Sequence, residues 1–176
     1  MINNTMIDSV INFGSTDSVA GRFDYLWGDE GGVPVVIASG WTTDPDYLAA
    51  LVHPRLRPTT IGRAGNPIID DAVQAYSGGE LTAIDAITVR QRSGPFVEAA
   101  WDALRKTAPG EPATYTRLAA DSGRPDAVRA AAYACARNAT ALFVPCHRII
   151  RRDGGLGGFR YGLAVKRILR AHESSR

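Results

Sequence analysis

The spacing of apolar residues changes at Ser93-Gly94-Pro95, and this change limits the possible folds more than any other feature of the chain. Before it, Phe23, Tyr25 and Trp27 fall at every second position, which is the period of a half-buried β-strand. After it, apolar residues over 96–104 follow one face of an α-helix of about three turns. We therefore predict an α/β (α+β) protein, with a small strand-and-helix domain over residues 1–92 and a mostly helical domain over residues 93–176.

Local signals predict the other elements of the first domain. Residues 33–37 form a short apolar run between glycines, and residues 81–90 indicate a further strand. Asp44-Pro45 is typical of a helix cap followed by a first-turn proline, so a helix should follow it. A second helix is expected over residues 68–76, ended by a pair of glycines. None of these elements indicates a chemistry.

The second domain contains the pattern of a helix-turn-helix. A short helix over residues 114–120 is followed by a turn at 121–124 and by a helix from Pro125 to about Arg137. Many alanines make this second helix slim, so that it can approach another surface closely. Alanine also favours helix formation and tight internal packing, so the composition alone leaves both interpretations open.

The charges are divided unevenly along the chain. The net charge of +2 is made up of −6 over residues 1–100 and +8 over residues 101–176. A basic half beside an acidic half indicates nucleic acid as a partner, because phosphate neutralisation drives such binding. A solvated basic face is the equally weighted alternative.

Several classes of protein are excluded or disfavoured. No apolar run approaches the ~20 residues of a membrane helix, and residues 1–8 lack the basic start and apolar centre of a signal peptide. We therefore expect a cytoplasmic protein without membrane contact. Cys135 and Cys146 are too few for a disulfide framework and lack the spacing of a zinc site, so we expect two free thiols, no metal and no cofactor.

Cys146 is the candidate nucleophile. A β-prone run over residues 140–144 leads into Pro145-Cys146-His147-Arg148, and such an electropositive setting is expected to lower the pKa of a thiol. A buried, inert cysteine is the alternative, and we assign it to Cys135. Because neighbouring strand residues point to opposite faces, a water between thiol and imidazole is the more natural proton relay. Glu173 is a candidate acceptor for the far nitrogen of the imidazole.

A glycine-rich segment over residues 153–162 follows the cysteine. It lacks the Gly-Lys-Ser/Thr of a phosphate-binding loop, and we expect it to close over a flat ligand or to form a flexible surface loop. The last helix should direct its apolar residues inward and its basic residues outward. The inward set is Ala164, Val165, Ile168 and Leu169, and the outward set is Lys166, Arg167 and Arg170.

The segment Pro145-Cys146-His147-Arg148-Ile149-Ile150, preceded by an arginine- and alanine-containing helix and Asn138, resembles the O6-alkylguanine-DNA alkyltransferases. These proteins are also called methylated-DNA–protein-cysteine methyltransferases. The likeness extends from Tyr76 to Glu173, whereas residues 1–70 match only loosely. It implies a DNA repair protein that flips O6-alkylguanine, with O4-alkylthymine as an open alternative, out through the minor groove. The alkyl group would pass irreversibly to the protein's own cysteine, without a cofactor. The implied partner is double-stranded DNA, bound by a monomer with clustering on DNA left open.

The resemblance also assigns roles to individual residues. Cys146 would accept the alkyl group, His147 would deprotonate it through a water, and Glu173 would orient the imidazole. Asn138 would hold the turn before the cysteine, Tyr115 would assist base flipping, and Lys166 would support the site. The implied DNA-binding residues are Arg129, which would fill the vacated base position, and Tyr115, Ala130, Ala132, Arg124, Arg137 and Arg148. The implied substrate pocket consists of Ile149, Phe159, Arg160 and Tyr161.

Three positions depart from the family pattern: Tyr133 on the recognition helix, Ala139 after the asparagine, and Phe159 in the loop over the base. Arg160 and Tyr161 crowd that loop, which favours small adducts. Two other functions remain open on the residues alone. One is a helix-turn-helix regulator or lesion-binding module, and the other is a cysteine hydrolase.

Overall fold

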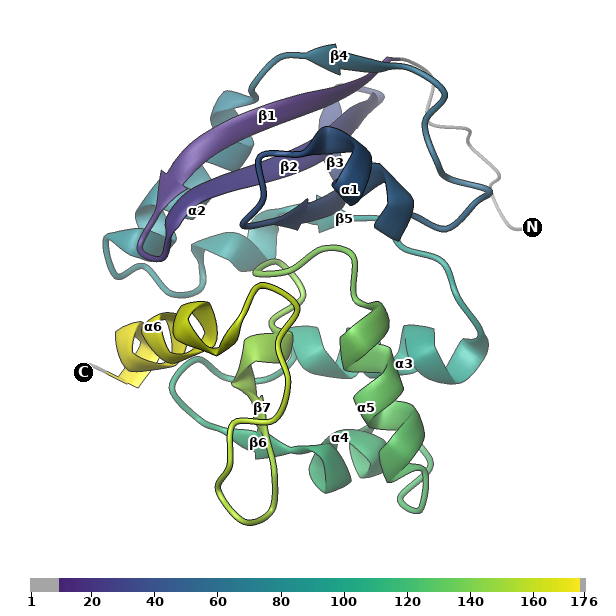
Figure 1. The fold of residues 1–176 in the computed structure, drawn as a ribbon, viewed down its shortest axis with the longest axis vertical. Helices are drawn as coiled ribbons and strands as arrows, with labels where there is room; N and C mark the ends of the chain where they lie inside the picture. Colours follow the sequence, from purple (N-terminus) through teal and green to yellow (C-terminus); the bar gives the residue numbers. More distant parts are fainter. Residues whose placement is uncertain (1–9, 175–176) are drawn as a thin grey trace.

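The computed structural model describes residues 10–174, so the expectation about residues 1–8 lies outside it. A five-stranded sheet forms the centre of the amino-terminal region (Figure 1). Its strands are β1 (Ile11–Ser18), β2 (Gly21–Glu30), β3 (Val33–Gly40), β4 (Ile61–Arg63) and β5 (Thr88–Val89), in the spatial order β4-β1-β2-β3-β5. The first three pair antiparallel, and β4 and β5 add parallel edges. The strands expected around Tyr25 and over 33–37 are confirmed, while β1 was not predicted.

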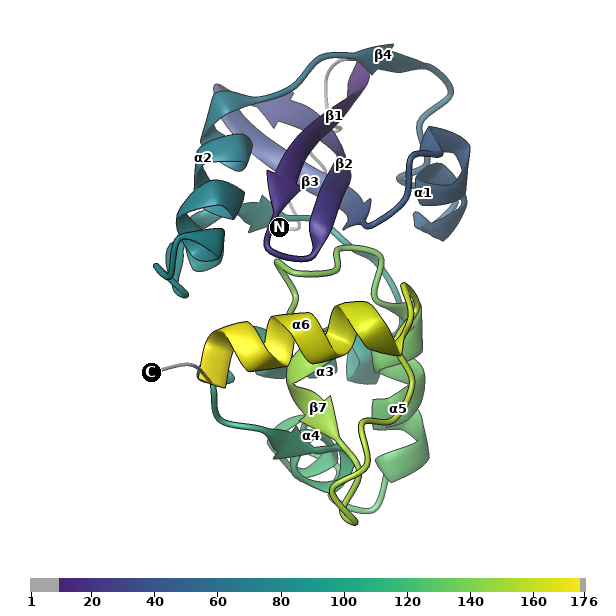
Figure 2. The same ribbon diagram turned by 60° about the vertical axis from the view of Figure 1, so that its left-hand side comes forward.

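The two predicted helices of this region are confirmed as α1 (Pro45–Leu51) and α2 (Pro67–Ser77). Asp44 caps α1 by accepting hydrogen bonds from two backbone N–H groups of its first turn. The helices pack on opposite faces of the sheet (Figure 2). Because both faces are covered, Leu26 is as fully buried as Tyr25, and β2 is buried on both faces rather than half-buried.

The strand predicted over residues 81–90 is wrong for most of its length. Ala83–Ala86 form a 3-10 turn, η1, and only Thr88–Val89 join the sheet. Ile84 and Ile87 are both buried, and their spacing of three residues suits a 3-10 turn better than a strand.

The carboxyl-terminal region is mostly helical. It consists of α3 (Pro95–Arg105), β6 (Ala113–Thr114), α4 (Tyr115–Asp121), α5 (Val128–Arg137), a 3-10 turn η2 (Cys146–Arg148), β7 (Ile149–Ile150) and α6 (Leu163–Ser174). The expected mixed fold and the helices around the turn at 121–124 are confirmed. Helix α5 starts later than predicted, because Arg124 to Ala127 form a turn closed by a backbone hydrogen bond of 2.9 Å.

Residues 140–144, predicted to be a strand, form a turn instead. Thr140 makes a single bridge to Ser39, and the backbone N–H of Val144 donates to the carbonyl of Thr140 at 2.9 Å. Leu142 takes a positive φ of 75°, which a strand does not allow. The turn is fully buried, so its apolar composition reflects burial rather than strand pairing.

One apolar cluster contains residues from both sides of the predicted boundary near residue 93. Phe143 and Leu169 of the carboxyl-terminal region pack in one cluster with Phe23 and Tyr76 of the amino-terminal region. Helix α6 lies between the sheet and the other helices (Figure 2). The predicted boundary marks the place where the chain changes from mainly strands to mainly helices. The division into two domains stays a prediction. Among residues 10–174, no helix is long and apolar enough to cross a membrane.

Candidate active site

Cys146 lies on the wall of a cavity of about 380 Å³ in the carboxyl-terminal region. Helix α5 lines one side of this cavity through Ala132 and Cys135, and Phe159 of the loop 151–162 lines another. The Cys146 side chain is placed by η2, directly after the buried turn 140–144. Only 8% of the residue is exposed, so a reactant must enter the cavity to reach the sulfur.

Asn138 connects the end of α5 to the thiol. Its Nδ2 donates to the carbonyl of Val144 at 2.8 Å and lies 3.3 Å from Cys146 Sγ. Its Oδ1 accepts from the backbone N–H of Thr140 at 3.1 Å and from Gln91 at 3.0 Å. Asn138 is therefore held from several sides and fixes the turn that presents the sulfur. Gln91, which comes from the loop before α3, was not predicted.

The expected lowering of the thiol pKa is wrong. Burial raises the pKa of Cys146, and this effect outweighs the Asn138 hydrogen bond and the positive charges of Lys166 and Arg160. The basic residues near this position in the sequence do not compensate for the loss of water around the sulfur. The resting thiol is consequently protonated near neutral pH, and nucleophilic attack requires a base.

His147 follows Cys146 in the chain and is paired with Glu173. The Nε2 atom of His147 lies 2.8 Å from Oε1 of Glu173, and both side chains are buried. Burial lowers the pKa of His147, so the ring is neutral near pH 7. Burial opposes ionisation of Glu173 as well, but hydrogen bonds and charges from His147 and Arg148 hold its pKa at about 2.

These charge states determine the tautomer of His147. An ionised carboxylate only accepts hydrogen bonds, so Nε2 must carry the proton and Nδ1 must carry a lone pair. Nδ1 is buried and has no hydrogen-bond partner among residues 10–174. A buried nitrogen acceptor without a partner is uncommon and indicates a site for a bound water or a reacting group.

Arg148, predicted to bind DNA, is buried instead of exposed. It is only 2% exposed, and its guanidinium donates to both carboxylate oxygens of Glu173 and to the carbonyl of Thr107. Its fork of donors satisfies a buried carboxylate and is not available to a phosphate. The arginine therefore belongs to the interior of the site.

Lys166 is buried, whereas the apolar spacing predicted that it points outward. Its Nζ donates to the carbonyls of Ile149, Leu156 and Gly158, which joins α6 to the strand after the cysteine and to the loop 151–162. The predicted inward face is wrong also at Ile168, which is 42% exposed, and at Ala164. Ile149 is buried and is not among the residues that line the cavity; its carbonyl accepts a hydrogen bond from Lys166.

The loop 151–162 is attached to the amino-terminal region. The Tyr161 hydroxyl donates to the carbonyl of Ser39 at 3.0 Å, and its ring lies 5.6 Å from the Trp41 ring. Gly40 permits this contact, because a Cβ at that position would lie 1.9 Å from the Tyr161 ring. Arg160 donates to the carbonyl of Ala136 at the end of α5. Phe159, Arg160 and Tyr161 all line the cavity.

The outer face of α5 is exposed beside this cavity. Arg129, Ala132 and Arg137 are exposed, and Tyr133 is 55% exposed, whereas Ala130 is half-buried. Arg129 lines an adjacent hollow of about 340 Å³ together with Ala132 and Tyr115. Tyr115 and Ala132 also line the cysteine cavity, so the two spaces share a wall.

Arg124 is exposed near the start of the turn before α5, with its guanidinium over the Phe96 ring at 5.7 Å. The structure therefore brings most of the other predicted residues to one cavity and one helix face, and it buries His147, Arg148, Ile149, Lys166 and Glu173 in the interior.

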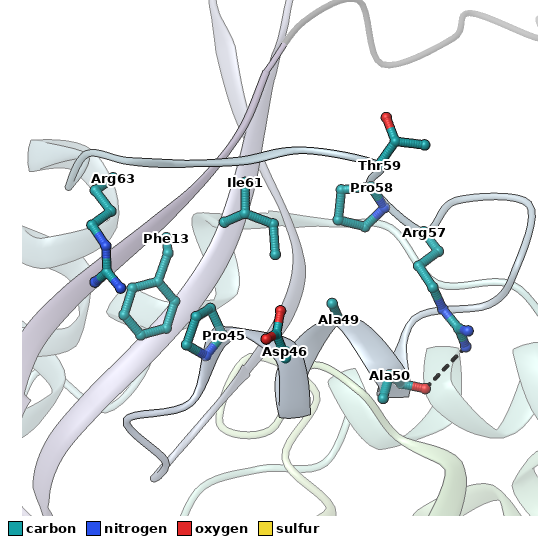
Figure 3. Close-up of a pocket in the computed structure, with 10 residues that line it drawn as sticks. All are labelled: Phe13, Pro45, Asp46, Ala49, Ala50, Arg57, Pro58, Thr59, Ile61 and Arg63. Carbon is teal, nitrogen blue, oxygen red and sulfur yellow. Dashed lines mark hydrogen bonds between the residues drawn. The ribbon is translucent and has the colours of Figure 1, made fainter.

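A larger hollow, of about 530 Å³, lies between α1 and the edge of the sheet (Figure 3). Phe13 and Ile61 form part of its apolar wall, and Asp46, Arg57 and Arg63 lie around it. Arg57 is engaged with the end of α1, where it donates to the carbonyls of Ala50 and Val52. No predicted site residue lines this hollow. Within residues 10–174 no group of three or more His, Cys, Asp or Glu side chains is placed to hold a metal ion.

The site thus consists of a cavity with Cys146 on its wall, a buried His147–Glu173 pair next to the cysteine in the fold, and an exposed alanine-rich helix beside the cavity. Residues 95–175 match the family model described as "6-O-methylguanine DNA methyltransferase, DNA binding domain". Residues 95–175 of the chain are therefore similar to the DNA-binding domain of this family.

Relatives with assigned names agree with the family. The chain is 38% identical over 105 residues to the methylated-DNA–protein-cysteine methyltransferase of Salmonella typhimurium, covering 60% of this chain and 61% of that protein. It is 45% identical over 83 residues to the bifunctional transcriptional activator/DNA repair enzyme Ada of Escherichia coli, covering 47% of this chain and 23% of that protein. The chain thus spans less than two thirds of the length of these curated relatives.

Solved structures extend the likeness to the amino-terminal region. The crystal structure of Mycobacterium tuberculosis OGT in complex with DNA matches with a TM-score of 0.76 and 27% identity, over 93% of both chains. The O6-methylguanine-DNA methyltransferase of Pyrococcus kodakaraensis shares the fold at a TM-score of 0.72 and 21% identity, over 93% of this chain and 99% of that one.

Proposed function

We propose that this protein repairs DNA by transferring the alkyl group of O6-alkylguanine to Cys146. The observation that carries the proposal is the unpartnered Nδ1 of a neutral His147, held by an ionised Glu173, next in the chain to a buried and protonated thiol. These groups lie where the chain matches a methyltransferase family.

The proposed reaction starts with the removal of the Cys146 proton. A water bound between the two groups takes the thiol proton while it passes a proton to His147 Nδ1, which leaves a thiolate and an imidazolium. Glu173 stabilises the imidazolium through the short contact at Nε2.

The thiolate then attacks the alkyl carbon in line with its bond to O6. A carbon–sulfur bond forms, the carbon–oxygen bond breaks, and its electron pair passes to the guanine, which takes up a proton. We propose the Tyr115 hydroxyl as the donor of that proton or of a hydrogen bond, because Tyr115 lines the cavity. The thioether is stable, so each molecule acts once.

The lesion must leave the duplex to reach the sulfur. A base inside the stack cannot enter a cavity, and flipping it out costs ~ a few kcal/mol. The exposed face of α5 fits the minor groove, because Ala132 and Ala136 add little width. Arg129 lies on this face beside the cavity, where it can fill the position of the flipped base. Arg124 and Arg137 are exposed and would contact phosphates.

The remaining proposals concern the setting of the reaction. Both cysteines are free thiols, which accords with a reducing compartment, and we propose the cytoplasm. We propose a monomer acting on double-stranded DNA. No step requires a cofactor or a metal.

A mass measurement tests this function. The protein is incubated with a duplex that contains one O6-methylguanine, and the intact mass and the modified peptide are determined. We expect one methyl group per molecule, located on Cys146. Cys146→Ala should show no gain and retain duplex affinity within a few-fold, and Cys135→Ala is the matched control that should still gain the methyl group. DNA binding without any adduct would instead support a lesion-binding module.

A further inference from the structure

The carboxylate of Glu173 is shared by donors from both regions of the molecule. The hydroxyl of Tyr76, on α2, donates to Oε1 at 3.0 Å. His147 contacts the same oxygen at 2.8 Å, and Arg148 donates to both oxygens. The backbone N–H of Gly110 reaches Oε2 at 3.4 Å. Tyr76 is the donor that comes from the amino-terminal region.

Tyr76 is held so that its hydroxyl points at Glu173. The residue is fully buried. Its ring packs against the ring of His172 at 5.2 Å, and its backbone carbonyl is 2.7 Å from His172 Nε2. Burial and the charge of Glu173 raise the pKa of Tyr76, so the hydroxyl is protonated and donates near neutral pH.

Tyr76 and His147 compete for the charge of one oxygen atom. A hydrogen bond from Tyr76 withdraws part of the negative charge of Oε1, and the remainder acts on the imidazole. We infer that Tyr76 is a positioning residue for alkyl transfer, which holds Glu173 against His147 and limits how strongly the carboxylate favours the imidazolium. This inference rests on the proposed function of Cys146, and it means that a side chain of the amino-terminal region supports the proton relay.

Other charged groups also lie around Glu173, and a test of Tyr76 must leave them unchanged. Arg148 contacts the carboxylate directly, and His172 contacts Tyr76. Lys166, on the same helix as Glu173, opposes protonation of His147. Arg170, also on this helix, contacts the carbonyl of Arg148 through a long hydrogen bond of 3.4 Å. None of these groups is changed when the hydroxyl of Tyr76 is removed.

The test is the pH profile of single-turnover methyl transfer for Tyr76→Phe. The carboxylate loses one donor, so more of its charge acts on His147 and the pKa of His147 rises. The acidic limb of the rate profile should therefore move to higher pH, by about half a unit. The plateau rate should fall about five-fold, which corresponds to one hydrogen bond of ordinary strength.

Tyr25→Phe is the matched control. Tyr25 is also a fully buried tyrosine of the amino-terminal region that donates to a carboxylate, Asp70, at 2.6 Å, but it does not contact Glu173. This variant should lose stability without any shift of the acidic limb. A limb that stays in place in Tyr76→Phe, or that moves equally in both variants, would overturn the inference. Wild-type protein without a methyl group on Cys146 would instead contradict the proposed function.

A second variant keeps the test informative if Tyr76→Phe does not fold. Incorporation of 3-fluorotyrosine at position 76 makes the hydroxyl a stronger donor while keeping the ring. The acidic limb should then move to lower pH, opposite to the shift in Tyr76→Phe. No shift in a folded 3-fluorotyrosine protein would show that Tyr76 has only a structural role.

Discussion

The carboxyl-terminal helices and the amino-terminal sheet contribute differently to the candidate site, the helices directly and the sheet region through contacts with other residues. The helical region provides the groups nearest to the reaction, which are Cys146, His147 and Glu173. The sheet region provides contacts one layer further out, through Tyr76 on Glu173 and Ser39 on Tyr161. The family match covers residues 95–175 and leaves the sheet region outside it. A region without a recognisable motif can therefore still determine how the motif residues are placed.

The same comparison separates two arginines that look alike in the sequence. Arg148 follows His147 in the chain and neutralises the buried carboxylate of Glu173, whereas Arg129 is exposed on α5. We expect Arg148 to stabilise the folded protein and Arg129 to contribute to DNA binding. Substitutions at these arginines, and at the contacts between the two regions, can test this difference.

The largest effect is expected from Arg148→Ala. Removing one partner of a buried ion pair leaves Glu173 charged in a dry environment, which costs about 3–5 kcal/mol of unfolding free energy. Arg129→Ala, at an exposed position, should change stability by less than about 0.5 kcal/mol. Urea unfolding of both variants measures the difference.

The salt dependence of duplex binding tests whether Arg148 is a DNA-binding residue instead. If Arg148→Gln folds and its binding to duplex shows a weaker salt dependence than wild type, Arg148 contacts phosphate and its assignment to the interior is incorrect. We expect the salt dependence to be unchanged in Arg148→Gln and weaker in Arg129→Ala.

Stability should depend on pH through Glu173. Its pKa is about 2 in the folded protein, below the ordinary value near ~4.3 in the unfolded chain. The resulting stabilisation is therefore fully present above pH ~4.3 and is lost as the pH falls toward about 2. It amounts to about 3 kcal/mol. Urea unfolding between pH 7 and pH 3 should show about half of this loss in wild type and none of it in Glu173→Gln.

His147 also contributes to the pH dependence of the unfolding free energy, at higher pH than Glu173. Burial lowers its pKa below the ordinary ~6.5, so protonation in the unfolded chain begins to oppose folding as the pH falls below that value. This contribution remains in Glu173→Gln. A wild-type curve that parallels that of the variant below pH ~4.3 would show that the carboxylate is not held ionised.

The sequence could predict those parts of the molecule that depend on local spacing. The helices α2 and α3 follow from apolar residues at helical spacing, and Asp44 marks the start of α1. The family motif identified Cys146 and its neighbours. The surroundings of these residues could not be predicted in the same way, because they come from segments far apart in the chain.

Buried charges were the main source of error. Lys166 and Arg148 look like surface residues in the sequence, since a long basic side chain is usually exposed. Their burial becomes intelligible only when the carbonyls around Lys166 and the carboxylate facing Arg148 are seen in space. The raised pKa of Cys146 has the same origin, because counting basic neighbours does not measure the loss of water.

A moderate effect is expected from Arg129→Ala on repair. If the arginine fills the position of the flipped base, its removal should slow methyl transfer from duplex DNA about ten-fold, since it offsets part of a flipping cost of a few kcal/mol. Transfer from free O6-methylguanine base needs no flipping and should be unchanged. Arg124→Ala is the matched control for the loss of one positive charge. Equal losses with duplex and free base would contradict this role of Arg129.

The smallest effect is expected from Tyr161→Phe, which tests the contact between the loop 151–162 and the sheet. The variant keeps the ring against Trp41 and removes the hydrogen bond to the carbonyl of Ser39, which is buried. One such bond is worth about 1 kcal/mol, so backbone amides of the loop should exchange with solvent about five-fold faster. Tyr133→Phe, which removes an exposed hydroxyl from α5, should leave this exchange unchanged. If exchange in the loop is equally slow in Tyr161→Phe, the ring contacts alone hold the loop, and the sheet region acts on the cavity through packing rather than through Ser39.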